Sequence, residues 1–359
     1  MSTKTINQRD YSLTGEEARR AEARGLASAD WHQATISRKQ MKELMRRKDG
    51  PAIRDTAIWL STMALCAVLG VHFWGSWLAV PFFIVYGVLY GSASDSRWHE
   101  CSHGTAFKTA WMNNAVYQLA CFMIMREPAV WRWSHTRHHT DTIIVGRDPE
   151  ISVKRPPDFA GLLLNFFAIK STFAALQKLA IHATGRLTEE EQTFIPEMER
   201  HKVFFTARVY ITILFAIAAL SFALHSWIPA MLAGLPTLYG GGLTIVYGIT
   251  QHAGLSEDVL DHRLNSRTVY MNPISRFIYW NMNYHVEHHM FPMVPYHALP
   301  ALHAAIKSQC AAPYPSIIAA YREIIPALLK QRHDPAYHVR RHLPPAAPAP
   351  AADYAAQPA

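Results

Sequence analysis

Two long stretches of the sequence contain neither lysine nor arginine, and they constrain the fold more than any other feature. The first lies between Arg54 and Arg97, and the second lies between Arg208 and Arg263. Both are apolar over most of their length, whereas basic residues crowd the segments around them. One helical crossing of a hydrocarbon core about 30 Å thick takes about 20 residues. Each stretch is long enough for two crossings, so the sequence predicts a membrane protein.

A soft break divides each apolar stretch into two halves. The breaks lie at residues 71–76 and 224–229. We therefore expect an all-α integral membrane protein with four transmembrane helices in two hairpins, at about residues 55–73, 76–95, 205–224 and 229–250.

The basic residues predict how these hairpins are oriented. Neither short turn contains Lys or Arg, whereas residues 1–52, residues 92–205 and the segment after Arg263 are rich in them. Loops that flank membrane spans carry an excess of Lys and Arg on their cytoplasmic side. We expect a multi-pass protein with both termini and the middle segment in the cytoplasm.

The domain organisation follows from these spans. Residues 1–52 form a basic cytoplasmic arm, residues 53–343 form the membrane domain, and the Pro- and Ala-rich residues 344–359 form a disordered tail. Residues 159–183 are apolar but contain two lysines, so we expect an amphipathic helix on the membrane surface rather than a crossing. We expect the shorter apolar segment 113–125 to lie there too.

Composition excludes several other classes of protein. The 359 residues include 35 Lys and Arg against 27 Asp and Glu, a formal charge of +8. No basic stripe with interleaved aromatic residues is present, so we expect no nucleic-acid partner. The four cysteines are scattered, which argues against a disulfide scaffold and for reduced thiols.

Histidine is the unusual component, because eight of the 20 histidines fall in three tight clusters at residues 99–103, 135–139 and 285–289. Spacings of three and four residues bring side chains onto one side of a helix. Neutral imidazole is a good ligand for iron, zinc or copper. The clusters therefore predict a metal site, and His252, near the end of the fourth expected span, is a further candidate.

Nine imidazoles are more than one metal ion needs. A structural zinc site closes with four ligands, and a mononuclear iron oxygenase typically uses two histidines and one carboxylate. Two ions with four or five nitrogen ligands each fit the number best. The predicted ligands are His99, His103, His135, His138, His139, His252, His285, His288 and His289.

At this point the sequence resembles the integral-membrane fatty acid desaturase and hydroxylase superfamily. The three histidine boxes occur in that family's order, with two spans between the second and third boxes, and the resemblance covers about residues 53–303. The lead-in residues 131–134 and 281–284 are also similar. The resemblance implies that two iron ions are held by the nine histidines in a cytoplasmic helical cap, with no catalytic side chain beyond the metal centre.

The resemblance also implies a reaction. Dioxygen would be activated at the two irons to remove two hydrogens from a saturated carbon pair, which makes the protein a desaturase. The alternative is a hydroxylase on the same scaffold. The sequence has no Cys-x-x-Cys cluster motif, no Gly-x-Gly-x-x-Gly fingerprint and no haem-binding segment, so a separate ferredoxin-like carrier with its reductase would supply the electrons.

The substrate implied is a fatty acyl chain in membrane lipid or a small saturated precursor. Residues 283–297 are similar to a bacterial branch that includes a dihydrorhizobitoxine desaturase, which suggests rhizobitoxine biosynthesis as one context. That branch also implies location in a bacterial inner membrane.

A competing motif lies inside the first cluster. Residues 99–103 also read His-Glu-x-x-His, the zinc metalloprotease signature, with His99 and His103 as ligands and Glu100 as general base. This alternative uses only two of the nine histidines, so it is a distant one.

Other polar side chains near the clusters are candidates for orienting the ligands. A ligating imidazole usually donates its second N–H to a carboxylate or a carbonyl. Asp148, Glu150 and Asn281 lie near enough in sequence, but the residues that we select are Glu100, Asp141, Asn283 and Glu287.

Overall fold

The computed structural model describes residues 9–27 and 29–345, and all named regular elements in these ranges are helices. Most of the expected tail, residues 346–359, lies outside the described residues. The elements are α1 (Glu16–Ala23), α2 (Arg38–Leu44), α3 (Asp49–His72), α4 (Ala79–Ser102), α5 (Ala110–Met123), α6 (Pro128–Thr140), α7 (Phe159–Phe166), α8 (Ile169–Ala183), α9 (Glu189–Gln192), η1 (Glu197–Glu199), α10 (Arg200–Ala223), α11 (Ile228–Leu232), α12 (Pro236–Gly240), α13 (Gly242–His252), α14 (His262–Asn265), α15 (Pro273–Ile278), α16 (His285–Met290), η2 (Tyr296–Ala298), α17 (Leu299–Ile306), η3 (Lys307–Gln309) and α18 (Ile317–Gln331).

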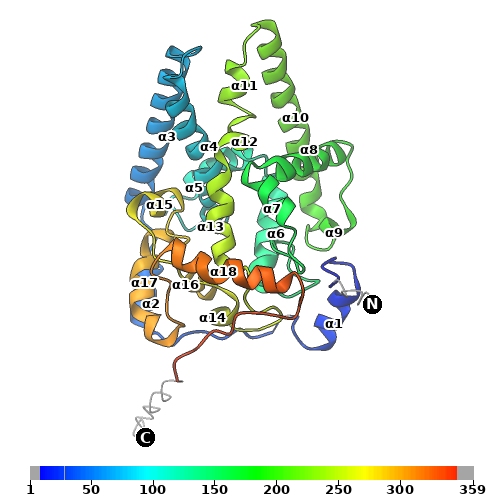
Figure 1. The fold of residues 1–359 in the computed structure, drawn as a ribbon, viewed down its shortest axis with the longest axis vertical. Helices are drawn as coiled ribbons and strands as arrows, with labels where there is room; N and C mark the ends of the chain where they lie inside the picture. The colour runs from blue at the N-terminus through cyan, green and yellow to red at the C-terminus, as the bar shows by residue number, and fades with distance from the viewer. Residues whose placement is uncertain (1–8, 28, 346–359) are drawn as a thin grey trace, which may run out of the picture.

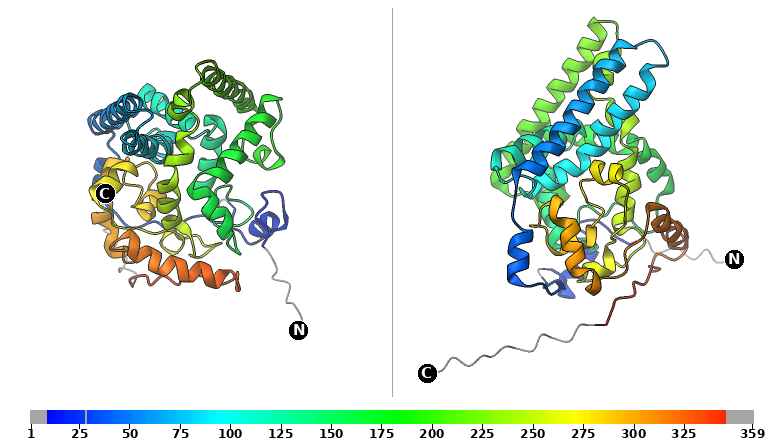
Figure 2. Two further views of the ribbon diagram at one scale, coloured as in Figure 1. Left: turned by 45° about the horizontal axis from the view of Figure 1, so that its top comes forward. Right: turned by 90° about the vertical axis from the view of Figure 1, so that its left-hand side faces the viewer.

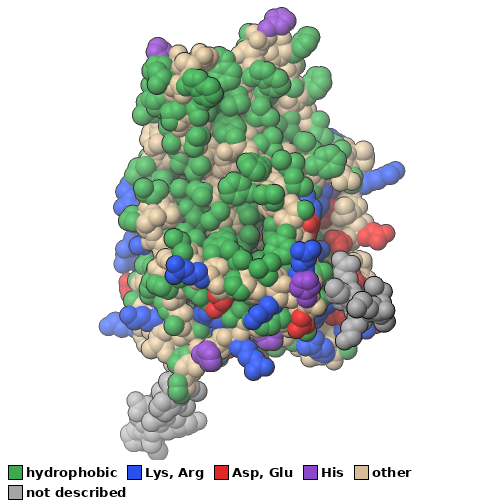
Figure 3. Space-filling view, in the orientation of Figure 1, with side chains coloured by type: hydrophobic (Ala, Val, Ile, Leu, Met, Phe, Trp, Pro, Cys, Tyr) green, Lys and Arg blue, Asp and Glu red, His purple; other side chains and the backbone are tan. Residues whose placement is uncertain are grey.

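The molecule divides into a hydrophobic upper half and a charged lower half. Helices α3, α4, α10 and α11 rise together from the body of the protein (Figure 1). The visible upper surface is almost wholly apolar, whereas Lys, Arg, Asp and Glu gather below it (Figure 3). We call the lower part, which contains α1, α2, α14, α16, α17 and α18, the cap. This division suits a protein embedded in a membrane by its upper half.

Fewer helices qualify as complete membrane crossings than the sequence predicts. By length and apolar composition, two helical stretches of the described chain could cross a membrane, Arg38–His72 and Glu197–Ala223. The pair α7 and α8 would add a third, but it is bent by 84°. Helix α8 runs across the direction of α10 (Figure 1), as a helix lying along a surface would.

The expected fourth transmembrane helix is not one continuous helix, and this part of the prediction is wrong. Residues 229–250 fall in α11, α12 and α13, which are separate short helices (Figures 1 and 2). Helix α11 packs beside α10, whereas α12 packs against α4. Pro229 and Pro236 each begin a new helical segment, because proline has no N–H to donate to a preceding turn. Gly234 adopts φ +93°, a left-handed conformation that ends α11.

Glycines allow this broken segment to lie directly against α4. A Cβ atom on Gly240 would lie 1.8 Å from the carbonyl carbon of Gly87, and one on Gly91 would lie 2.9 Å from the backbone nitrogen of Gly241. The Ser92 hydroxyl donates a 2.5 Å hydrogen bond to the Gly240 carbonyl. Small residues spaced by four let helix backbones approach in membranes. This contact fixes α4, which carries the first histidine cluster.

Substitution of Gly240 by Ala should therefore loosen the upper half. The added methyl group meets backbone atoms that cannot move aside, and such overpacking costs about 1–3 kcal/mol or more. We expect a lower thermal midpoint for detergent-purified protein, followed by fluorescence-detected size exclusion after heating. Gly248→Ala is the matched control, because a Cβ atom added at Gly248 would meet no atom within 4 Å. Equal midpoints for the two variants would contradict the proposed backbone contact.

Candidate metal centre

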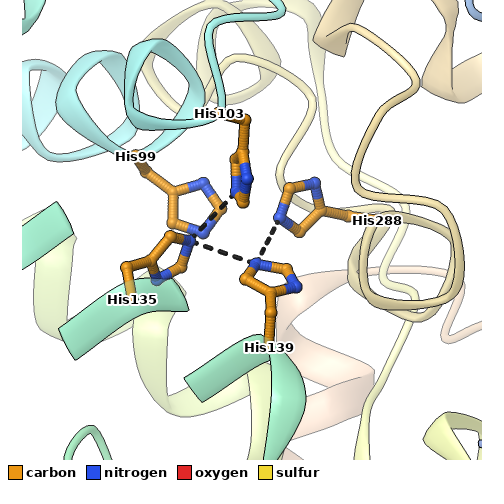
Figure 4. A group of neighbouring side chains, drawn as sticks. All are labelled: His99, His103, His135, His139 and His288. Carbon is orange, nitrogen blue, oxygen red and sulfur yellow. Dashed lines mark hydrogen bonds between the residues drawn. The ribbon is translucent and has the colours of Figure 1, made fainter. Parts of the chain in front are cut away.

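All nine predicted histidines converge where the ends of α4, α6 and α13 meet α16. Their nitrogen atoms form two groups, and within each group the candidate ligand atoms lie within 4.8 Å of one another. The first group, drawn in Figure 4, contains five side chains, and the second contains four. The groups are His99, His103, His135, His139 and His288, and His138, His252, His285 and His289.

Four separate segments supply these side chains. The first cluster lies at the end of α4, the second on the last two turns of α6, and the third on the short helix α16, while His252 is the last residue of α13. Helical spacing explains how each segment serves the site. Residues 135 and 139 lie one turn apart and point into the first group, whereas residue 138 points into the second.

The ring nitrogens face one another at hydrogen-bond distance. In the first group the Nε2 atom of His135 lies 3.1 Å from those of His103 and His139. In the second group the Nε2 atom of His285 lies 2.9 Å from that of His252 and 3.0 Å from that of His289. Each group is therefore a ring of imidazole nitrogens around a common centre.

The electrostatics of the two groups suit a bound cation. Burial, and then repulsion from neighbouring imidazoles, holds the pKa of His139, His288 and His289 well below the usual range. These rings are therefore neutral at physiological pH and can present lone pairs to a metal ion. An all-nitrogen set of this kind fits iron, zinc or copper.

Carboxylates and a carbonyl orient three of the rings from behind. The Nδ1 atom of His138 lies 2.8 Å from Asp148, and that of His135 lies 3.0 Å from Glu150. His252 places its Nδ1 atom 2.8 Å from the backbone carbonyl of Asn265. Such partners fix the ring so that Nε2 points at the metal position. For His138, burial opposes the charged ring, but Asp148 outweighs burial and raises the pKa.

Of the four orienting residues that we select from the sequence, Glu100 lies beside the outer nitrogens of two candidate ligands. Glu100 is fully buried, and its Oε1 atom lies 3.5 Å from Nδ1 of His288 and 3.8 Å from Nδ1 of His99. Its Oε2 atom accepts a hydrogen bond from the backbone of Tyr296. Glu100 therefore stands behind two rings of the first group.

The structure places the other three elsewhere. Asp141 accepts hydrogen bonds from Arg137 and Arg147. Asn283 donates to the backbone carbonyl of Val269. Glu287 lies 2.5 Å from His303 and accepts from Thr268, because its side chain leaves α16 on the side opposite to the ligand rings. Nearness in sequence to a candidate ligand therefore does not by itself place a side chain beside the rings.

Two further contacts could not be found from sequence. The hydroxyl of Thr142 lies 3.2 Å from Nδ1 of His289, and the backbone of Asn265 holds His252. A backbone carbonyl has no residue type to identify it, and Thr142 belongs to the loop after α6. Only the path of the chain brings these groups to the site.

Asp148→Asn tests the orienting role. An amide can keep the contact with His138 but loses the negative charge, and changes of this kind weaken metal binding by about 10- to 100-fold. We expect the variant to lose metal to a chelator at lower chelator concentration, measured by elemental analysis after equilibrium dialysis. Asp141→Asn is the control, since Asp141 contacts arginines only. Identical chelator curves for both variants would exclude the orienting role.

A buried group of one histidine and two carboxylates holds the start of α6 in place. His182 on α8 lies between Glu127 and Glu191, at 2.6 Å from the first carboxylate and 2.8 Å from the second, and its side chain is fully buried. Lys178 makes an ion pair with Glu191. Because Glu127 precedes the first residue of α6, this cluster anchors the helix that carries the second histidine box.

The charge state of His182 predicts a pH-dependent stability. Burial opposes its charge, but hydrogen bonds and attraction from Glu127 and Glu191 prevail and raise the pKa of His182 to about 9. The folded state then binds more protons than the unfolded state between the unfolded pKa, about 6.5, and 9. Stability from this cluster is complete below that window and is lost as pH rises through it.

We therefore expect the thermal midpoint of the wild type to fall between pH 7 and 9 more steeply than that of His182→Gln. His333→Gln, which changes an exposed histidine, should follow the wild type. Parallel curves for wild type and His182→Gln would show that the cluster does not gain a proton on folding.

The fold and the site together define an α-helical membrane protein with a histidine-rich metal site. The fatty acid desaturase family matches residues 75–321, which is more than half of the chain and includes all nine histidines. The chain belongs to the fatty acid desaturase family. The superfamily prediction made from the histidine boxes is thereby confirmed.

A relative from Caenorhabditis elegans agrees with this assignment. Delta(5) fatty acid desaturase fat-4 is 25% identical to this chain over 245 residues. The match covers 60% of this chain and 54% of the relative, so the chain spans about half the length of that protein.

The metalloprotease alternative does not fit this geometry. Three further imidazoles share a group with His99 and His103, whereas a catalytic zinc keeps three protein ligands and an open position. Glu100 is fully buried behind the rings rather than at an open position. The His-Glu-x-x-His pattern is part of a larger histidine site.

Proposed function

We propose that this protein is a dioxygen-dependent desaturase that introduces a carbon–carbon double bond into a fatty acyl chain, with two iron ions as cofactors. The observation that supports this most directly is the pair of adjacent imidazole groups. Nine imidazole donors in groups of five and four match two metal ions better than one. Iron is the ion that would combine this ligand type with dioxygen chemistry.

Each imidazole group would bind one of the two ions. The five-histidine group would hold one iron and the four-histidine group the other. The iron pair, when bound, would use dioxygen and two electrons to take hydrogen from an unactivated carbon. Asp148, Glu150 and the Asn265 carbonyl keep three ligand rings in their orientation, and the burial of the rings limits access of water to the reacting carbon.

The substrate and the surroundings follow from the same arrangement. The first histidine cluster lies at the end of α4, a helix that rises into the apolar half (Figure 1), so an acyl chain could reach the site from the bilayer. The name of the worm relative, a Delta(5) fatty acid desaturase, favours an acyl substrate. Because the cap contains the basic helix α2 (Figure 1) and basic segments mark the cytoplasmic side of a membrane protein, we place it in the cytoplasm, where a ferredoxin-like carrier would supply electrons.

The test is a comparison of cells that express the wild type or His138→Ala. We expect the variant to lose both bound iron and the unsaturated product, with at least about a 100-fold loss of product, because removing a ligand disrupts the metal site. Elemental analysis of purified protein and mass spectrometry of lipid extracts measure the two losses. His201→Ala, at an exposed histidine, should behave as wild type.

The products also separate the alternatives. A histidine-dependent loss of two hydrogens from a lipid supports the proposal. The same loss in the polar extract indicates a small precursor such as dihydrorhizobitoxine, and gain of one oxygen indicates a hydroxylase. Zinc instead of iron in the active wild type, or full activity of His138→Ala, would contradict the di-iron assignment.

A further inference from the structure

Two aromatic rings outside the nine-histidine set connect the cap surface to the second imidazole group. Trp31, in the N-terminal arm, stacks on His262 with ring centroids 4.2 Å apart and planes 4° from parallel. The His262 ring in turn lies 5.1 Å from that of His289, at an angle of 32°. Trp31 is partly exposed and His262 is buried, with 2% of its surface accessible. The rings thus form a continuous stack from the protein surface to a candidate ligand.

This stack is held firmly by hydrogen bonds on both sides. The indole N–H of Trp31 donates to the backbone carbonyl of Thr140, the last residue of α6. The backbone N–H of His32 donates to the carbonyl of Leu260, two residues before His262. Trp31 also packs against the buried cluster of Ala21, Leu26 and Ile144. The arm is therefore fastened to both segments that flank the second imidazole group.

We propose that Trp31 and His262 form the entry path by which electrons from a carrier protein reach the metal centre. This inference rests on the proposed function, which needs two electrons per turnover from outside the chain. Each transfer oxidises the carrier by one electron and reduces the metal pair by one electron. The two rings pass the electron on and return to their starting state, so the transfer requires no net proton movement through them.

The surface around this path fits an acidic one-electron carrier with an iron–sulfur or haem group. The arm continues from Trp31 into α2, where Arg38, Lys39 and Lys42 are exposed. A basic surface attracts an acidic partner and speeds its encounter. Transient redox partners need only a small contact area, so a partly exposed ring is sufficient.

A second aromatic chain reaches the first imidazole group, but an arginine covers it: the Arg126 guanidinium lies 3.9 Å from the ring centroid of Trp131 and 4.5 Å from that of Trp98. Trp98 lies 5.3 Å from His135, and Trp131 lies 5.5 Å from Trp98. Trp131 packs against a cluster containing Val203, in the first turns of α10, which is long and apolar enough to cross a membrane. Because Arg126 covers these two rings and Trp131 packs beside a candidate membrane span, we assign electron entry to Trp31.

The test compares Trp31→Leu with Trp31→Phe in iron-loaded, full-length protein. A photoreduced [2Fe–2S] ferredoxin is mixed with excess oxidised enzyme in a stopped-flow instrument, and oxidation of the ferredoxin is followed at saturating concentration. We expect Trp31→Leu to slow the limiting rate by about tenfold, a barrier increase of about 1.4 kcal/mol. Trp31→Phe keeps a stacked ring and should retain most of the wild-type rate.

The controls separate this inference from the proposed function. His32→Leu changes the adjacent exposed side chain and should leave the ferredoxin rate unchanged. Iron content and reduction by dithionite, which needs no docking site, should be normal in all three variants. A wild-type ferredoxin rate in Trp31→Leu, or a parallel loss of iron or dithionite reduction, would overturn the entry path. Absence of iron or of dithionite reduction in the wild type would instead contradict the proposed function.

Discussion

The convergence of nine imidazoles on two small volumes is the constraint on which the rest of the structure depends. The Nε2 atoms of neighbouring rings approach to about 3 Å, and burial keeps rings such as His139 and His288 neutral by lowering their pKa. Buried polar atoms without suitable partners are costly. A cation bound in each group would supply the missing partner, and its binding energy would then become part of the folding energy.

The scaffold must bring four distant segments to this place, and it does so by close backbone packing and buried polar contacts. Gly87 and Gly240 let α4 and α12 touch. Arg97, which is fully buried, donates to the carbonyls of Phe277 and Ile278. Its guanidinium also packs over the ring of Trp280, 4.9 Å from the centroid. This one side chain ties the segment before the third histidine box to the helix that carries the first.

The grouping of the candidate ligands could be anticipated from the sequence because the spacing that produces it is local. Spacings of three and four residues on a helix place His135 and His139 on one face wherever that helix lies. His252 could be proposed because it ends an apolar stretch. Long apolar segments likewise predict a membrane protein before any packing is known.

The contacts around the candidate ligands are harder to predict because they depend on tertiary structure. Glu287 is adjacent to His288 in sequence, yet its side chain leaves α16 toward His303. Asp148 lies ten residues after His138, and the loop returns it to 2.8 Å from the ring. The break between α11, α12 and α13 follows from prolines and glycines that are plain in the sequence. Hydropathy alone does not reveal the break, because the stretch is apolar throughout and long enough for one span.

The N-terminal arm is the segment whose role in the structure differs most from the role that the sequence predicts. Its basic residues predict orientation in the membrane, but several of them bind the cap. Arg9 makes ion pairs with Glu257 and Asp258, and the Tyr11 hydroxyl donates to Glu257. Glu257 also faces Arg155, at 3.2 Å, on the segment that follows the second histidine box. The arm thus joins that segment to the residues after His252, and Trp31 extends the same connection to His262. A segment that composition alone would assign to topology is therefore part of the wall around the second imidazole group.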